Sequence, residues 1–146
     1  MALSAAKPRV FLADVPQIDV VMPLKATTQV YEGSLLMFSS GAVAPVSGAG
    51  VFAGVCMETA LGGAADGDVL VKVRVYGAME FTVTSDSVAL STIGVVATVP
   101  EATDDDTLRI ETGASTTGTN LGKFLRAITT GAGGKVVVHF KGAQVA

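Results

Sequence analysis

The stretch Asp68-Val69-Leu70-Val71-Lys72-Val73-Arg74-Val75-Tyr76 is the longest regular pattern in the chain. Its valines recur at every second position, Leu70, Lys72 and Arg74 lie between them, and Tyr76 follows the last valine. Because successive side chains of a strand point to opposite faces, the pattern predicts a half-buried strand whose valine face packs into a core. The other face is then available to solvent or to a partner molecule.

On both sides of this stretch, short runs of strand-forming residues alternate with turns rich in Gly, Asp and Ser. Such turns have a physical basis, since glycine adopts positive φ and aspartate bonds to its own backbone. Many short strands at this spacing predict an all-β fold, either a small antiparallel β-barrel or a sandwich. The predicted strands are residues 18–22, 34–38, 51–58, 69–76, 79–84, 95–98, 107–110, 123–128 and 135–140.

Residues 1–17 differ from the remainder, residues 18–146, which we interpret as a single β domain. Pro8 and Pro16 bracket an apolar run without a glycine turn, and proline both lacks an amide donor and keeps the preceding residue extended. The segment is therefore predicted to be an extended arm, either a frayed terminus or a strand donated to a partner's sheet edge. In the second case we expect it to be disordered in the free protein. At most one short helix is predicted, at Ser85–Ile93, where Ser85 or Asp86 could cap it.

Composition restricts the classes of partner. Of the 146 residues 49% are hydrophobic and 16% are charged, and the formal net charge is −3. This balance gives no positive surface for a phosphate backbone, so no nucleic-acid partner is expected. No run approaches the roughly 18 apolar residues that span a bilayer, so no membrane partner is expected either. The high apolar content favours a surface covered by other copies of the chain, hence a homo-oligomer.

Reactive side chains are scarce. His139 is the only histidine and Cys56 the only cysteine, too few for a histidine-based triad, a common zinc site or an intrachain disulfide. The run Asp104–Asp106 lacks the ligand spacing of an EF-hand and is interpreted as a solvated turn. We therefore predict no enzymatic activity, no metal and no cofactor. An enzyme with an unfamiliar carboxylate site built around Glu58, Asp66 or Asp68 is the alternative.

The order of glycines and strands resembles the capsid cement, or head-decoration, proteins of tailed bacteriophages over about residues 20–140. The resemblance is carried by Pro23-Leu24-Lys25-Ala26, Tyr31-Glu32-Gly33-Ser34-Leu35-Leu36, Phe52-Ala53-Gly54-Val55-Cys56-Met57-Glu58 and Gly67-Asp68-Val69-Leu70-Val71-Lys72-Val73 with Gly77. Gly122-Lys123-Phe124-Leu125 and Lys135-Val136-Val137-Val138 resemble the closing hairpin of that family. The family-pattern positions are Pro23, Tyr31, Gly33, Gly54, Val55, Gly67 and Gly77.

The resemblance implies a virion structural protein, made in the host cytoplasm and added to the outside of an expanded head shell. Its partner would be the major capsid protein, and a homotrimer is the favoured oligomer. Bridging neighbouring capsid subunits would stabilise the lattice by multivalent contact. The arm residues expected to bind the capsid are Pro8, Val10, Phe11, Leu12, Val15 and Pro16. The alternatives are another virion or head-to-tail assembly component, and a small ligand-binding β-barrel.

Overall fold

The computed structural model of the chain describes residues 2–84, 86–95, 98–112 and 118–145. The fold is all-β, as predicted, and the described residues contain no helix. The strands are β1 (Ile18–Pro23), β2 (Gln29–Val30), β3 (Leu35–Ser39), β4 (Ala42–Pro45), β5 (Phe52–Cys56), β6 (Ala60–Leu61), β7 (Leu70–Thr82), β8 (Ser87–Val88), β9 (Thr98–Ala102), β10 (Leu108–Thr112), β11 (Thr119–Asn120), β12 (Gly122–Ala127), β13 (Gly131–Ala132) and β14 (Lys135–Lys141).

The long strand β7 organises the main sheet, whose order is β12-β14-β7-β5-β3-β4 with β1 also paired to β7. It joins two strands that the sequence predicted separately, and Gly77 lies between the two halves. The predicted alternation is confirmed in the first half, where Val71, Val73 and Val75 are buried. Leu70, on the opposite face, has 57% of its surface exposed. One face of this half therefore belongs to the core and the other does not.

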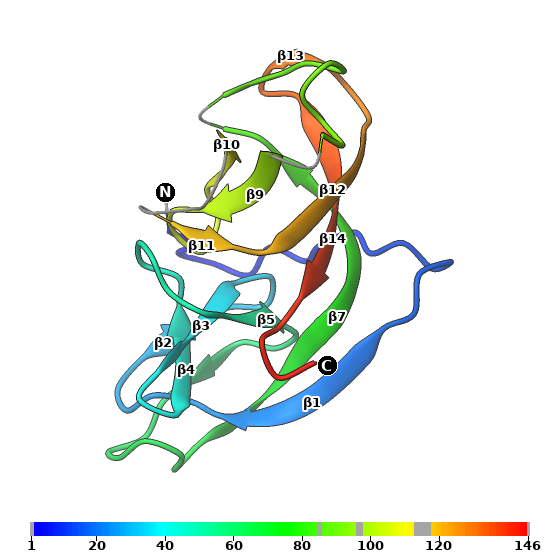
Figure 1. Cartoon of the computed structure of the whole chain (residues 1–146). Helices are drawn as coiled ribbons and strands as arrows, with labels where there is room; N and C mark the ends of the chain where they lie inside the picture. Colours follow the sequence, from blue (N-terminus) through cyan, green and yellow to red (C-terminus); the bar gives the residue numbers. More distant parts are fainter. Residues whose placement is uncertain (1, 85, 96–97, 113–117, 146) are drawn as a thin grey trace.

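Two different segments close one edge of β7, as Figure 1 shows in blue. β1 pairs with the first half, from Ile18 opposite Tyr76 to Pro23 opposite Leu70. The N-terminal arm covers the second half, with Phe11 opposite Met79. On the other edge, β5 pairs near Arg74 and β14 pairs from residue 76 to residue 82. Residues 13–17, the last part of the arm, leave this edge, and the chain returns to it at β1.

The core consists of two hydrophobic clusters. Consecutive residues Leu35 and Leu36 of β3 are both fully buried, and they belong to different clusters. Since neighbouring side chains of a strand point in opposite directions, β3 must lie between the two clusters. All five residues of β5 are also buried. β7 contributes Val73 to one cluster and Met79 to the other, so a single strand ties both together.

The sheets are not closed into a barrel, which corrects one of the two predicted architectures, while a sandwich is compatible with the arrangement. Three smaller sheets complete it, with strand orders β10-β9-β11, β13-β8 and β2-β6. The strand pairs within all of these sheets are antiparallel. In the part of the chain that the structure describes, no helix is long and apolar enough to cross a bilayer.

The helix predicted at Ser85–Ile93 is wrong for the residues described there. Ser87 and Val88 form β8, and residues 90–94 form turns. Asp86 does not cap a helix, because its carboxylate accepts a hydrogen bond from the Ile110 backbone N–H at 2.9 Å. Ser85 lies outside the described residues, as do residues 96 and 97 of the predicted strand 95–98; the observed strand β9 begins at Thr98.

Candidate functional site: the N-terminal arm and its seat

The arm is fixed to β7 by backbone hydrogen bonds of the kind that join neighbouring strands. The Leu12 N–H donates to the Ala78 carbonyl, and the Glu80 N–H donates to the Val10 carbonyl, each at 2.9 Å. Further toward the N-terminus, the Lys7 N–H donates to the Glu32 carbonyl at 2.8 Å. The arm thus adds a short strand to a sheet edge of its own chain, which corrects the expectation that it is disordered in the free protein.

Arg9 anchors the arm through its side chain, of which only 5% is exposed. Its Nε donates to the Gly33 carbonyl at 2.9 Å, and a terminal nitrogen lies 3.2 Å from the Asp105 carbonyl and 3.0 Å from the Asp106 carboxylate. The guanidinium also stacks 4.4 Å from the centre of the Phe81 ring. Burial lowers the pKa of Arg9, and the neighbouring Asp106 and Asp105 oppose this shift. A planar cation with several fixed donors suits such a site.

Asp105 attaches the beginning of the arm to the domain. Its side chain accepts hydrogen bonds from the Leu3 backbone N–H at 2.7 Å and from the Ser34 hydroxyl at 3.0 Å. Only 2% of the residue is exposed, so the interpretation of residues 104–106 as a solvated turn is wrong at this position. Burial raises the pKa of the Asp105 carboxyl, an effect larger than that of its two donors. Asp106 is more open and pairs with both Lys7 and Arg9.

Gly33 lets the arm approach the domain closely. Its φ is +94°, a conformation that L side chains rarely adopt. A Cβ built there would lie 1.9 Å from the Lys7 carbonyl oxygen. The glycine therefore serves both the turn before β3 and the seat of the arm.

The six arm residues predicted to contact a capsid lie in different surroundings. Phe11 is half-buried, with its ring edge-on to Phe140 at 6.0 Å between centroids. Leu12 and Val15 are also half-buried, and the Gln17 side chain returns to the Leu12 carbonyl. The three that remain outside are Pro8, Val10 and Pro16. The structure thus divides this set into residues that attach the arm and residues that it presents outward.

The family-pattern positions are spread over the domain and do not form one site. Pro23 ends β1, Gly54 and Val55 are in β5, and Gly77 is in the middle of β7. Tyr31, in the turn before β3, accepts a hydrogen bond from the Ser34 N–H through its carbonyl, and Gly67 lies in the turn before β7. Gly33 lies against the arm at Lys7, and Gly77 lies near the Gln17 side chain at the end of the arm.

The carboxylates considered for an enzyme each bond to the backbone. Glu58 accepts from the Lys72 N–H, Asp66 from the Ala26 N–H and Asp68 from the Ala65 N–H, at 2.8 to 3.0 Å. Burial raises the pKa of the Cys56 thiol to about 11, which keeps it in the unreactive protonated form. Within the described residues, no group of three or more His, Cys, Asp and Glu is arranged to hold a metal ion.

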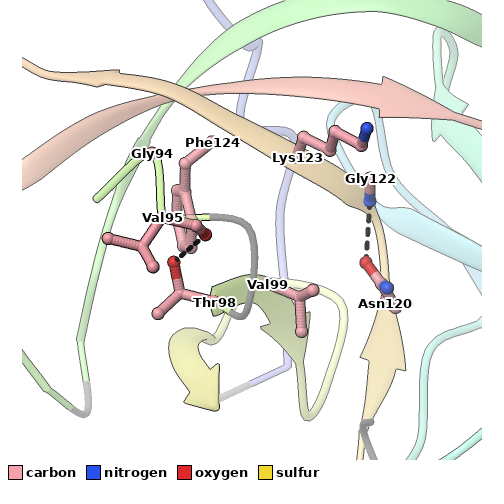
Figure 2. A pocket seen from close by; sticks show the side chains of 8 residues that line it. All are labelled: Gly94, Val95, Thr98, Val99, Asn120, Gly122, Lys123 and Phe124. Atoms are coloured by element: carbon pink, nitrogen blue, oxygen red, sulfur yellow. Dashed lines mark hydrogen bonds between the residues drawn. The ribbon is translucent and has the colours of Figure 1, made fainter. Parts of the chain in front are cut away.

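Figure 2 shows a pocket of about 200 Å³ between the start of β9 and the start of β12. Thr98 donates to the Val95 carbonyl, and Asn120 accepts from the Gly122 N–H. Lys123 is the single ionisable side chain among the residues that line it. The pocket is smaller than the roughly 300 to 1,000 Å³ of ordinary small-molecule sites, and its lining offers no acid–base pair.

Comparison with known proteins gives no assignment: no protein-family model matches the chain, and a search of curated proteins found no match.

Analysis of the sequence missed Arg9, Asp105 and Asp106 as the groups that seat the arm. The available signal was a single arginine between apolar neighbours, Pro8 and Val10, in a segment predicted to be extended. Such a residue needs a partner when the strand is covered, and the strongest acidic cluster in the chain is residues 104–106. Nothing local in the sequence joins the two, because they are 96 residues apart.

Proposed function

We propose that this protein is a virion structural protein that binds the outside of a tailed-phage head shell and stabilises it by bridging neighbouring capsid subunits. The observation that carries the proposal is the outer face of β1 and β7, which lies opposite the core. Val21 and Leu70 have 65% and 57% of their surfaces exposed on adjoining strands. On the same face, next to Val21, Asp19 is paired with Arg74 and Lys72.

This mixture suits adhesion. Apolar side chains supply the free energy of association, and the ion-paired cluster fixes orientation. A standard interface covers about 800 Å² on each partner, and contacts with several subunits make detachment slow even when each contact is modest. Val10, an exposed residue of the arm, lies along the same edge of β7 and extends the surface that a shell could cover.

The proposal includes the major capsid protein as partner and a homotrimer as the bound form. No particular observation favours the head-to-tail component over it. The ligand-binding barrel has less support, because the sheets are not closed into a barrel.

Co-sedimentation with expanded, undecorated head shells of the phage whose genome encodes the chain tests the proposal. The full-length protein should pellet with the shells in a fixed ratio to capsid subunits. Leu70→Asp should weaken binding about tenfold or more, since it places a charge in the contact. Leu90→Asp is the matched control, because Leu90 is exposed in a turn away from this face, and it should bind within about twofold of the parent. Failure of the full-length protein to pellet would overturn the proposal.

A further inference from the structure

Some Lys and Arg side chains of this protein form ion pairs with described residues of the chain, and others do not. Of its ten Lys and Arg residues, seven have a carboxylate of the same chain within 4.0 Å. The three that form no ion pair within the described part of the chain are Lys123, Arg126 and Lys141. All three belong to the hairpin of β12 and β14.

Strand register places these cations on one surface. Lys123 is opposite His139, and Lys141 lies two residues beyond His139 and opposite Tyr76. Residues directly opposite or two apart share a face, so the four side chains lie together on the outside of the sheet. The rings of Tyr76 and His139 meet edge-on with centroids 4.9 Å apart. Together with Gly122, these four residues line a hollow of about 390 Å³.

A bulge in β12 adds an apolar residue to the same region. The register shifts between Phe124 and Arg126, so that both Leu125 and Arg126 face Val137. Leu125 is left with 48% of its surface exposed, and Arg126 is exposed beside it. We call this surface, formed by Tyr76, Lys123, Leu125, Arg126, His139 and Lys141, the hairpin face.

We propose that the hairpin face is a docking surface for a partner protein whose contact region is rich in Asp and Glu. Charge complementarity carries the proposal. Of the three cations without an ion pair to the described residues, Lys123 and Lys141 line the hollow and Arg126 lies beside the exposed Leu125, whereas the other cations are paired within the chain. A carboxylate-bearing surface would neutralise the cations and cover Leu125. A nucleic acid fits less well, because its uniform backbone charge would meet the net negative charge of the remaining molecule. The inference holds for any acidic partner and does not rest on the proposed function.

Fluorescence anisotropy with a labelled oligo-glutamate peptide tests the inference on the full-length protein. The peptide should bind at low ionic strength and more weakly at physiological ionic strength. Lys123→Glu and Lys141→Glu should each weaken binding about tenfold. Lys25→Glu is the matched control, because it makes the same charge change at an exposed lysine that pairs with Asp66, and it should bind within about twofold of the parent.

Four outcomes would overturn the inference. One is the absence of peptide binding at low ionic strength, and another is equal weakening by the control substitution. The third is tighter binding of a single-stranded oligonucleotide of equal charge. If instead the glutamate variants aggregate while peptide affinity is unchanged, the cations serve only to protect the edge strand β12 from pairing with other chains, and the inference also fails.

Discussion

β1 and the N-terminal arm close the same edge of β7 by different physical means. β1 pairs along six consecutive residues, with one register shift between Ile18 and Asp19, and its position follows from this ladder. The arm makes two backbone bonds to β7, and it is held further by side-chain contacts to residues far away in the sequence, chiefly those of its own Arg9 and of Asp105. Arg74 touches both segments, since it pairs with Asp19 of β1 and stacks 4.5 Å from the Phe11 ring centre. A ladder is fixed by many equivalent contacts, whereas the arm depends on a few, so the two should respond differently to single substitutions.

The largest effect is expected from Gly33→Ala. It places a Cβ against the Lys7 carbonyl and imposes backbone strain, so we expect a loss of about 3 kcal/mol in unfolding free energy. The backbone amide of Leu12 should also lose hydrogen-exchange protection while that of β1 residue Met22 keeps it. Denaturant unfolding and exchange mass spectrometry measure the two quantities.

Gly41→Ala is the control that introduces backbone strain without a new contact to the arm. Gly41 has a similar φ of +87°, and a Cβ there would meet nothing within 4 Å. This variant should lose about 1 to 2 kcal/mol from strain alone and keep the Leu12 amide protected. Equal exchange behaviour in both variants would show that Gly33 does not seat the arm.

A smaller effect is expected from Arg9→Ala. It removes a buried cation that donates to Gly33 and Asp105 and pairs with Asp106, so we expect a loss of about 2 kcal/mol. Arg9→Lys keeps the charge without the planar set of donors and should lose about half as much. Both should loosen the arm in hydrogen exchange before β1 is affected. If the lysine variant matched the parent, charge alone would explain the anchor.

The smallest effect is a difference in pH dependence. The bond to Arg74 holds the pKa of Asp19 below its ordinary value, so its contribution to stability is complete above about pH 3.9 and is lost as the pH falls further. Burial raises the folded-state pKa of Asp105, so the folded form binds its proton more readily than the unfolded form. As the pH falls from neutral toward about 3.9, the parent should therefore gain stability relative to Asp105→Asn.

Denaturant unfolding across this pH range compares the parent with Asp19→Asn and with Asp105→Asn. The difference between the parent and the Asp19 variant should stay constant down to about pH 3.9 and shrink below it. Parallel pH profiles for the parent and the Asp105 variant would contradict the assigned direction for Asp105.

The all-β class and the buried face of β7 could be predicted, because both depend on residues that are close together in the sequence. The valine alternation at residues 69–75 predicted the buried face of β7, and the all-β class followed from turns and short strands. The union of both halves of β7 was not predicted, because Gly77 is typical of a turn. β4 was missed because its Ala and Pro residues are weak strand formers.

The seat of the arm could not be predicted by the same means. Arg9 and Asp105 are ordinary polar residues until the fold brings them together, and the information that joins them is long-range. Pro8 and Pro16 predicted an extended arm, and in the structure Phe11 bridges to Met79 whereas residues 13 and 14 form a turn. Proline says nothing about which edge the strand will join. The sequence therefore predicted which segment forms the candidate site, but not which residues that segment contacts.

The detour of residues 13–17 has a practical consequence. The chain is held at Leu12 on one side and from Ile18 on the other, and most of the residues between are exposed. Lengthening a flexible loop is inexpensive, since each doubling of its length costs only about 0.6 kcal/mol. A foreign peptide grafted between Asp14 and Val15 would project outward with both of its ends clamped, which makes this detour the natural position for displaying an epitope on the molecule.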